Sequence, residues 1–340
     1  MGGFSTESFR KNLEGKKILV TGGAGFIGSH LVENLLSLGC FVTVLDNFST
    51  GKRENLAPFA GNSCFRLLEG DIRNMQDCRK ALEGATLVLH EAALGSVPRS
   101  IKDPVTSTHV NILGFVNMLF ACVEAGIGRM VYAASSSAYG DSKELPKVED
   151  TIGKPLSPYA ITKVVNELYA ANFHDLYGID TVGLRYFNVF GPRQDPDSAY
   201  AAVIPKFAKA FLAHESPLIH GDGSHSRDFT FVENVVQANL LALTCGKKEA
   251  LNTVYNVACG NRTTLNELFT ILRAALARFD ASVGKIKAVY GPERKGDVPH
   301  SLASIRKAEE LLGYSPLVSV QEGLRITGEW FAEKQGLSAR

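Results

Sequence analysis

The sequence has almost no net charge and no long hydrophobic run. Its 36 lysines and arginines balance 35 aspartates and glutamates, which leaves a net charge of +1. No long basic segment offers a surface for nucleic acid or for an anionic membrane. No run of about 18 apolar residues could span a bilayer, and the first 17 residues lack the apolar segment of a signal peptide. We therefore predict a cytoplasmic protein that binds neither nucleic acid nor membranes.

Cysteine is also sparse. The six cysteines are scattered through 340 residues, with no C-x-x-C pair and no histidine nearby at the spacing of a metal ligand. This pattern excludes a disulfide scaffold and a zinc site of the usual kind. We expect reduced, mostly buried thiols and no bound metal.

The chain has enough apolar residues, 45% of its composition, for a full core. Near its start, the apolar run 16–21 leads into a glycine-rich turn and then into a helical pattern of apolar residues. Strand, glycine turn and helix are typical of dinucleotide binding, because glycines let the backbone approach a pyrophosphate at a helix N-terminus. We predict that Gly22, Gly25 and Gly28, with Phe26 and Ile27, form this site.

A second apolar run, 41–45, ends at Asp46, about twenty residues past the glycines. A carboxylate there accepts the ribose hydroxyls of NAD and repels the 2′-phosphate of NADP. Asn47 and Arg53 lie nearby and keep this preference from being absolute. A strand-end aspartate that only caps a turn is the alternative.

Strands and helices alternate after this point. Further strands are expected at 64–68, 87–90, 129–134 and 180–186, with helices at 75–82, 105–124 and 158–177. This order predicts an α/β fold with a doubly wound parallel sheet of the Rossmann type. Glycine and proline turns become denser after residue 190. We therefore divide the chain into residues 1–190, mainly the NAD-binding domain with the catalytic groups, and 191–340, mainly a smaller substrate-binding α/β region, with some exchange of elements between them.

Tyr159 and Lys163 are four residues apart in the expected helix 158–177, so their side chains are neighbours. A free phenol titrates near pH 10, and a nearby cation lowers that value, which makes the pair a candidate acid/base unit. The spacing alone also fits an ordinary helix with an exposed lysine. Hydroxyl side chains, Ser135, Ser136 and Ser137, follow the strand 129–134 at its carboxyl end, where ligands bind.

With these features in order, the sequence resembles the extended short-chain dehydrogenase/reductase family over nearly its whole length. Residues 21–28 have the glycine pattern of that family's nucleotide-sugar branch rather than the general G-x-G-x-x-G. Residues 90–93, Asn111 with Gly114, residues 184–188, and residues 227–229 with Val232 match further family landmarks. Within that branch the chain is similar to UDP-hexose 4-epimerases.

Two segments narrow the resemblance to bacterial enzymes that act on N-acetylated UDP-hexosamines in surface-polysaccharide synthesis, such as O-antigen and lipopolysaccharide synthesis. Residues 94–100 (Leu-Gly-Ser-Val-Pro-Arg-Ser) are similar to a loop of that group. Ser301 stands where glucose-specific bacterial relatives carry a bulky tyrosine. Related 4,6-dehydratases need acids after the catalytic hydroxyl, whereas Ser136 and Ser137 occupy those positions here.

The resemblance assigns roles to individual residues. Counting back from Tyr139 aligns Ser135 with the family's catalytic hydroxyl, although Ser136 and Ser137 stay candidates; Tyr159 and Lys163 complete the catalytic set. NAD-binding residues are expected to be Gly22, Gly25, Phe26, Ile27, Gly28, Asp46, Asn47, Ser49, Thr50, Gly51, Asp71, Ile72, Ala92, Ala93, Asn111, Tyr159, Lys163 and Tyr186. Substrate-binding residues are expected to be Gly95, Ser96, Ser135, Ser136, Ser137, Asn188, Val203, Arg227, Arg294, Asp297 and Ser301.

The implied reaction is a 4-epimerisation without net redox change. NAD accepts a hydride from C4 of the sugar while the Tyr159 phenolate removes the hydroxyl proton, and the hydride returns to the other face after the 4-keto sugar turns. Lys163 supplies positive charge, and Ser135 bonds the reacting oxygen. Arg227 and Arg294 anchor the diphosphate, although Arg227 beside Asp228 also fits a surface ion pair.

Three other interpretations stay open. The substrate could be plain UDP-glucose and UDP-galactose, or a UDP-(N-acetyl)hexosaminuronate whose carboxylate meets Arg99. A non-catalytic dinucleotide sensor with this fold would have lost the tyrosine, lysine or serine, and all three are present.

Helices 105–124 and 158–177 carry apolar residues on more than one face, and the family forms a four-helix interface there, so we expect a homodimer.

Overall fold

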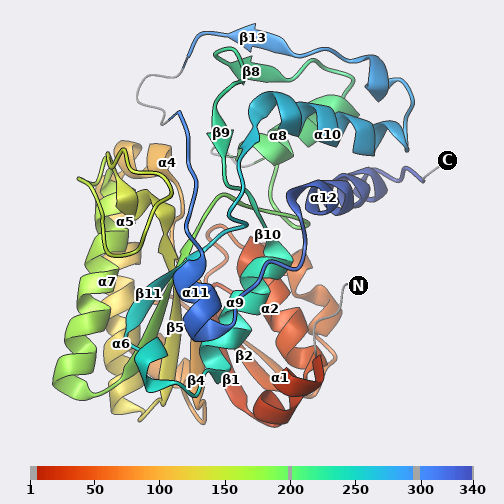
Figure 1. Ribbon diagram of the computed structural model, residues 1–340. Coiled ribbons are helices and arrows are strands. Elements are labelled where there is room, and N and C mark those ends of the chain that lie inside the picture. The colour runs from red at the N-terminus through yellow and green to blue at the C-terminus, as the bar shows by residue number, and fades with distance from the viewer. Residues whose placement is uncertain (1–5, 198–200, 294–298, 339–340) are drawn as a thin grey trace.

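The central element of the fold is a sheet of seven parallel strands in the order β11-β6-β5-β4-β1-β2-β3. The computed structural model describes residues 6–197, 201–293 and 299–338 (Figure 1). The strands of this sheet are β1 (Lys17–Thr21), β2 (Phe41–Asp46), β3 (Phe65–Glu69), β4 (Leu87–His90), β5 (Arg129–Ser135), β6 (Asp180–Tyr186) and β11 (Thr253–Val257). The predicted doubly wound Rossmann-type sheet is therefore confirmed.

The strand order reverses between β1 and β4. The chain runs outward from β1 through β2 to β3, then returns to place β4 on the other side of β1. Loops that follow β1 and β4 therefore diverge and leave a crevice at the carboxyl ends of the strands, which is where open α/β sheets bind ligands.

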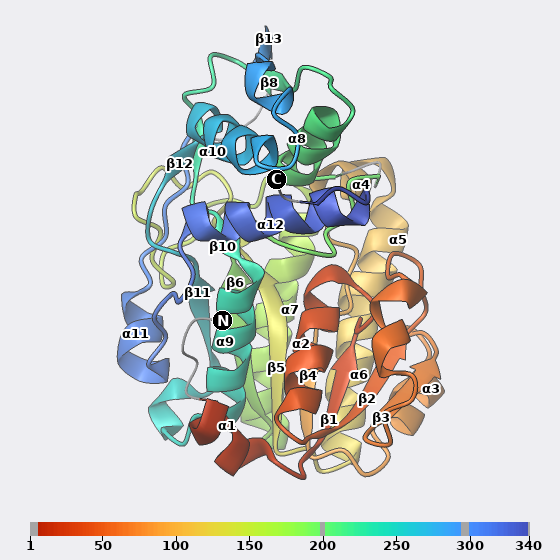
Figure 2. The same ribbon diagram turned by 90° about the vertical axis from the view of Figure 1, so that its right-hand side faces the viewer.

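Helices cover both faces of the sheet (Figures 1 and 2). One face carries α3 (Met75–Ala81), α5 (Pro104–Thr108), α6 (Gly114–Glu124) and α7 (Pro158–Tyr177). The other carries α1 (Thr6–Leu13), α2 (Phe26–Ser37), α9 (Val232–Thr244) and α11 (Arg306–Leu312). In β1, Ile18 and Val20 pack on the α2 side and Leu19 packs on the α6 side. Because side chains alternate along a strand, burial on both faces requires the continuous apolar run in the sequence.

A smaller region stands over one end of the sheet (Figure 2). It contains α8 (Val203–Leu212), α10 (Leu265–Ala277), α12 (Val320–Lys334) and the paired strands β8 (Leu218–His220) and β13 (Val289–Gly291). Its own core is rich in phenylalanine, with Phe207, Phe211 and Phe269 in contact. β11, α9 and α11 lie beyond residue 190 in the chain but belong to the layers of the large sheet.

The remaining elements are short. Two-residue strands are β7 (Val189–Phe190), β9 (Ser226–Arg227), β10 (Thr230–Phe231) and β12 (Thr263–Thr264), and α4 spans Val97–Lys102. Short 3-10 turns span Arg53–Asn55, Ala57–Phe59, Ser136–Tyr139, Lys248–Ala250 and Val283–Lys285.

The predicted helix 105–124 differs in detail from the structure. Between α5 and α6 the backbone forms a π-helical turn, His109–Leu113, a feature that periodicity cannot predict. The whole run Pro104–Glu124 is also long and apolar enough to cross a membrane by length and composition alone, which corrects the expectation that no such stretch exists. Half of its most apolar window is buried inside the protein, where Phe115 and Met118 belong to the core.

Candidate functional site

A cavity of about 530 Å³ occupies the crevice between the loops that follow β1 and β4. Seventeen of the eighteen predicted NAD-binding residues line its wall, and Asn111 is the exception. They are Gly22, Gly25, Phe26, Ile27, Gly28, Asp46, Asn47, Ser49, Thr50, Gly51, Asp71, Ile72, Ala92, Ala93, Tyr159, Lys163 and Tyr186. The glycine turn, Asp46 at the end of β2 and the helix that carries Tyr159 and Lys163 therefore lie around the same cavity.

The glycine turn forms a close-packed cradle. A Cβ atom on Gly28 would lie 2.2 Å from the Gly22 carbonyl oxygen, and one on Gly22, whose φ is +68°, would lie 2.8 Å from the Ala92 backbone. Helix α2 begins after Gly25, and no side chain caps its first turn. First-turn N–H groups at the cavity wall therefore suit the pyrophosphate of a dinucleotide, so the residues present fit NAD.

Asp46 ties the end of β2 to this turn. Its Oδ2 accepts a hydrogen bond from the Ala24 N–H at 2.9 Å, and its Oδ1 accepts one from the Phe48 N–H at 2.8 Å. Burial raises the pKa of the carboxyl, and the two backbone hydrogen bonds oppose that rise. Each oxygen keeps a second lone pair, so the carboxylate can also accept from ribose hydroxyls.

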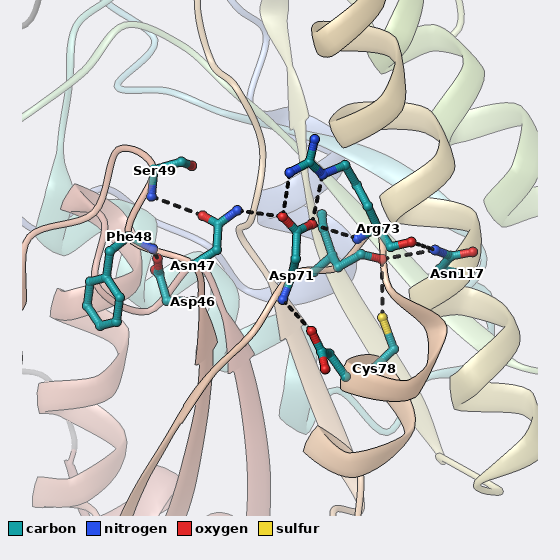
Figure 3. Close-up of polar contacts among 10 residues, drawn as sticks. Asp46, Asn47, Phe48, Ser49, Asp71, Arg73, Cys78 and Asn117 are labelled. Carbon is teal, nitrogen blue, oxygen red and sulfur yellow. Dashed lines mark hydrogen bonds and ion pairs between the residues drawn. The ribbon is translucent and has the colours of Figure 1, made fainter.

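Asp71 forms a small charged cluster beside Asp46 (Figure 3). Its Oδ2 accepts from Asn47 Nδ2 at 2.8 Å and from Arg73 Nη2 at 2.6 Å. The hydrogen bond from Arg73 is the main cause that lowers the Asp71 pKa to about 2. Sequence analysis included this carboxylate among the NAD-binding residues and did not consider Arg73, which follows it by two residues.

Asn111 lies behind the cavity wall rather than on it. Its Oδ1 accepts from the Leu94 N–H at 2.8 Å, and its Nδ2 donates to the Leu94 carbonyl and to Thr162 Oγ1, each at 3.2 Å. Because these bonds engage both ends of the amide, the structure places Asn111 as a clamp that holds the loop after β4 against α7. Asn111 is therefore absent from the cavity wall, and its contact with the cofactor stays a prediction.

Tyr159, Lys163 and Ser135 meet at the other end of the cavity. Ser157 caps α7, and Ser100 Oγ accepts from the Tyr159 N–H at 3.0 Å, which fixes the start of the helix. Lys163 Nζ lies 6.0 Å from the Tyr159 ring centroid and donates to the Ala133 carbonyl at 2.6 Å. Lys163 is only 3% exposed, so the alternative of an exposed surface lysine does not hold.

The charges at this end are governed by burial. Burial raises the pKa of Tyr159, and a hydrogen bond with Ser135 opposes the rise. The lowering by Lys163 that we expected from the sequence is not found. Burial likewise lowers the pKa of the Lys163 ammonium to about 8, with Glu91 and Glu167 acting in the opposite direction. A phenol that is to act as a base here needs further positive charge beside it.

The three serines occupy different positions. Ser135 and Ser136 line the cavity, whereas Ser137 lies behind Ser135. Ser137 donates from its Oγ to Ser135 Oγ at 2.9 Å and from its backbone N–H to the same atom at 3.2 Å. Ser135 thus accepts two hydrogen bonds from behind, and its own hydroxyl proton is left to face Tyr159, which favours Ser135 among the three candidates.

Sequence reasoning missed a carboxylate in this cavity. Glu91, directly after β4, lines the wall, and its Oε1 accepts a hydrogen bond from the Tyr186 hydroxyl at 2.8 Å. In the sequence analysis, Glu91 was noted only as part of the family landmark at residues 90–93. A charged residue at the end of the apolar strand 87–90 was the available signal.

A second cavity of about 620 Å³ adjoins the first, since Asn188 and Val189 line both. The predicted substrate residues Asn188, Val203 and Arg227 lie on its wall. Arg227 Nη1 donates to the Ser226 carbonyl at 3.0 Å and to the Pro299 carbonyl at 3.1 Å, and Asn188 Nδ2 donates to the Asp228 carbonyl at 2.9 Å. Further wall residues with basic side chains were not predicted: Lys206, His220 and His225.

Other predicted substrate residues have other positions. Gly95 lines the first cavity, and Ser96 caps α4 by accepting from the Arg99 N–H at 3.2 Å. The Ser301 N–H donates to the Ser226 carbonyl at 3.1 Å, which joins the segment after residue 298 to β9. Helix α11 begins at Arg306, so Ser301 does not cap it. Arg294 and Asp297 lie outside the described residues.

Comparisons with known proteins agree with this geometry. Residues 18–258 match the family described as the NAD dependent epimerase/dehydratase family. A UDP-N-acetylglucosamine 4-epimerase from Methanobrevibacter ruminantium, solved with UDP-N-acetylmuramic acid, is 41% identical over 94% of this chain and 99% of its own, with a TM-score of 0.87.

Two further solved structures carry other sugars. A UDP-glucose 4-epimerase from Thermotoga maritima with UDP-glucose is 38% identical over 94% of this chain and 99% of its own, with a TM-score of 0.86. A UDP-glucuronic acid 4-epimerase from Bacillus cereus, solved with NAD and a UDP-sugar analogue, is 32% identical over 94% and 98%, with a TM-score of 0.83. All three relatives are named as 4-epimerases, and they differ in the UDP-sugar for which they are named.

Proposed function

We propose that this chain, which belongs to the NAD dependent epimerase/dehydratase family, inverts the configuration at C4 of a UDP-hexose. The observation that carries the proposal is the convergence of Tyr159, Lys163 and Ser135 on the wall of the glycine-turn cavity. An acid/base pair beside a hydroxyl donor suits proton transfer at an alcohol carbon. Similarity to three 4-epimerases of UDP-sugars supports the same reaction class.

Residues at one end of the first cavity would bind the cofactor, and residues at the other end would transfer the proton. The glycine turn and the α2 N-terminus would hold the pyrophosphate, and Asp46 would accept the ribose hydroxyls. Bound NAD supplies the acceptor, and later the donor, of the two electrons and hydrogen at C4. Tyr159 receives the C4 hydroxyl proton and returns it, Ser135 bonds the same oxygen, and Lys163 holds positive charge beside the phenolate.

The second cavity is the proposed seat of UDP. Arg227 and Lys206 supply cationic charge there for a diphosphate, and Asn188 lies at the junction of the two cavities. An anchored diphosphate leaves the sugar in the shared region, where a 4-keto sugar can turn about its linkage and present its other face.

We further propose UDP-N-acetylglucosamine and UDP-N-acetylgalactosamine as the preferred pair, in the synthesis of surface polysaccharide such as O-antigen. Ser301 and the 41% identity to a UDP-N-acetylglucosamine 4-epimerase support this choice. Arg99, the cation expected for a uronate, and Ser301 both lie outside the residues that line the two cavities, so cavity lining does not separate a uronate from an N-acetylhexosamine. The free state of all six cysteines supports a cytoplasmic location.

Substrate size provides the test of this preference. Ser301→Tyr adds a phenol ring near Arg227 and Ser226, where we expect the sugar's N-acetyl group to need space. Adding bulk to a filled site costs about 1 to 3 kcal/mol, roughly tenfold to over a hundredfold in rate. We expect kcat/KM to fall by that factor for UDP-GlcNAc and UDP-GalNAc and to change little for UDP-Glc and UDP-Gal.

The matched control is Ser304→Tyr, three residues farther along the chain. It should leave the ratio of acetylated to plain activities at the parent value. If Ser301→Tyr also leaves that ratio unchanged, N-acetylhexosamine specificity loses its main support, while the 4-epimerase proposal stands on the plain sugars.

We also propose a homodimer formed through α5, α6 and α7. Apolar side chains are exposed along these helices, including Val105 at 64%, Leu168 at 65% and Leu176 at 65%. Exposed apolar faces of this extent are typical of interfaces. Leu168→Asp should therefore shift a micromolar sample from dimer to monomer in sedimentation velocity, because burying an unpaired charge is unfavourable.

Val289→Asp is the control for the dimer. Val289 is 51% exposed on β13, in the smaller region away from α7 (Figure 1). This variant should sediment as the parent does. A parent protein that is monomeric at micromolar concentration would contradict the proposed interface.

A further inference from the structure

Glu91 is a cavity carboxylate for which the proposed reaction has no role. The described acids on the wall of the first cavity are Asp46, Asp71 and Glu91. Asp46 and Asp71 lie beside β2 and β3, at the end expected to hold adenosine. Glu91 lies at the other end, where its charge acts on both Lys163 and Tyr159.

A directed chain of hydrogen bonds holds Glu91 as an acceptor. Asn239 Nδ2 donates to the Val235 carbonyl and to the Tyr186 oxygen, each at 2.9 Å. Because the carbonyl of Val235 can only accept, the amino group of Asn239 must face this side. The Tyr186 oxygen is therefore an acceptor from Asn239, and its own proton points to Glu91 Oε1 at 2.8 Å. This direction suits an ionised carboxylate.

These hydrogen bonds cross the sheet at the bottom of the cavity. Glu91 follows β4 and Tyr186 ends β6, while β5 lies between these two strands. Lys163 Nζ donates to the Ala133 carbonyl in β5. The Glu91 carboxylate therefore lies under the part of the cavity where Tyr159 and Lys163 stand, which is where the nicotinamide end of NAD has to lie for reaction.

We propose that the Glu91 carboxylate tunes bound NAD: its negative charge favours the oxidised, positively charged nicotinamide over the neutral reduced form. The proposal rests on the proposed function, which puts the nicotinamide beside Tyr159. During epimerisation, two electrons and the C4 hydrogen leave the sugar together, and the hydroxyl proton goes to Tyr159. Glu91 would then promote return of the electron pair and hydrogen to the keto carbon, so that the enzyme is not left reduced after a keto sugar escapes.

The titration of the site agrees with this role. Burial raises the pKa of Glu91 to about 7, while the Tyr186 hydrogen bond and the Lys163 charge oppose the rise. Positive charge on a neighbouring nicotinamide would stabilise the Glu91 carboxylate further. By the same interaction, the Glu91 carboxylate would stabilise the positively charged nicotinamide.

Glu91→Gln tests the proposal, because the amide oxygen can still accept from Tyr186 while the charge is lost. The holoenzyme is poised at about pH 8 with a redox couple of known potential, and bound reduced nicotinamide is read from its absorbance. At a fixed poise we expect the ratio of reduced to oxidised cofactor to rise about tenfold, roughly 30 mV for a two-electron couple. Glu149→Gln, which neutralises a buried carboxyl bonded to the Asn256 N–H away from the cavity, should leave the ratio unchanged.

A second measurement covers a variant that is isolated without cofactor. The ratio of the Kd for NAD+ to the Kd for NADH gives the same free-energy difference through a thermodynamic cycle, and it should also rise about tenfold in Glu91→Gln. A change of less than about twofold in whichever ratio is measured would overturn the proposal. Neither measurement contains a sugar, so a failed epimerase assay and a failed Glu91 proposal are told apart.

Discussion

Replacing Tyr159 with phenylalanine should lower kcat by about 10²–10⁴-fold, the usual cost of removing a general acid/base. The phenyl ring keeps the volume of the side chain, so the fold and the bound NAD should be retained. Only the oxygen that bonds with Ser135 and faces the substrate is lost. Turnover of UDP-GlcNAc and the NAD released on denaturation measure the two effects separately.

Tyr177→Phe is the matched control, since it makes the same change at the exposed end of the same helix. It should turn over substrate as the parent does. Ser135→Ala should cost less than Tyr159→Phe and clearly more than Ser137→Ala, because Ser135 lines the cavity and Ser137 only supports it. Activity of Tyr159→Phe within a few-fold of the parent would move the base to another residue.

Gly28→Ala should strip the enzyme of its cofactor. The parent is expected to co-purify with a sizeable fraction of one equivalent of NAD, because epimerisation uses it without net consumption. In the variant, the new methyl group would lie 2.2 Å from the Gly22 carbonyl oxygen and 2.8 Å from the Gly23 Cα, so the turn must move. Overpacking of this kind costs about 1 to 3 kcal/mol or more, tenfold to over a hundredfold in Kd.

Chromatography of the denatured protein measures the released cofactor. Gly246→Ala serves as control, because a Cβ there has no neighbouring atom within 4 Å, and it should release as much NAD as the parent. Retention of a full complement of NAD by Gly28→Ala would show that the glycine turn does not cradle the pyrophosphate. Release of NADP alone from the parent would contradict the role given to Asp46.

Local patterns predicted much of the fold and the site. Continuous apolar runs located β4 and β6 with their observed ends, because strands that are buried on both faces are apolar throughout, and a helical pattern located α7. Tyr159 and Lys163 were found for the same reason, because an i,i+4 pair is fixed by helix geometry alone. The glycine turn and Asp46 each follow a strand directly, so their place at the sheet edge follows from the strand.

Long-range contacts account for what the sequence did not reveal. Tyr186 bonds Glu91, 95 positions away, and Asn239 lies a further 53 positions along the chain. Asn111 is an amide that fits either a ligand or a loop clamp, and only its contacts with Leu94 and Thr162 decide between them. The pKa of Tyr159 could not be predicted from the nearness of Lys163, because the burial that raises it is set by the tertiary structure.

One assay tests the central proposal most directly. The purified protein is incubated with UDP-GlcNAc, UDP-Glc and UDP-GlcA in separate reactions without added cofactor, and the products are resolved by chromatography. We predict conversion to the C4 epimers, fastest for UDP-GlcNAc, with no net change in the absorbance of reduced nicotinamide. Failure to interconvert any of the three sugars by a protein that holds NAD, or formation of a dehydrated or oxidised product instead, would contradict a 4-epimerase.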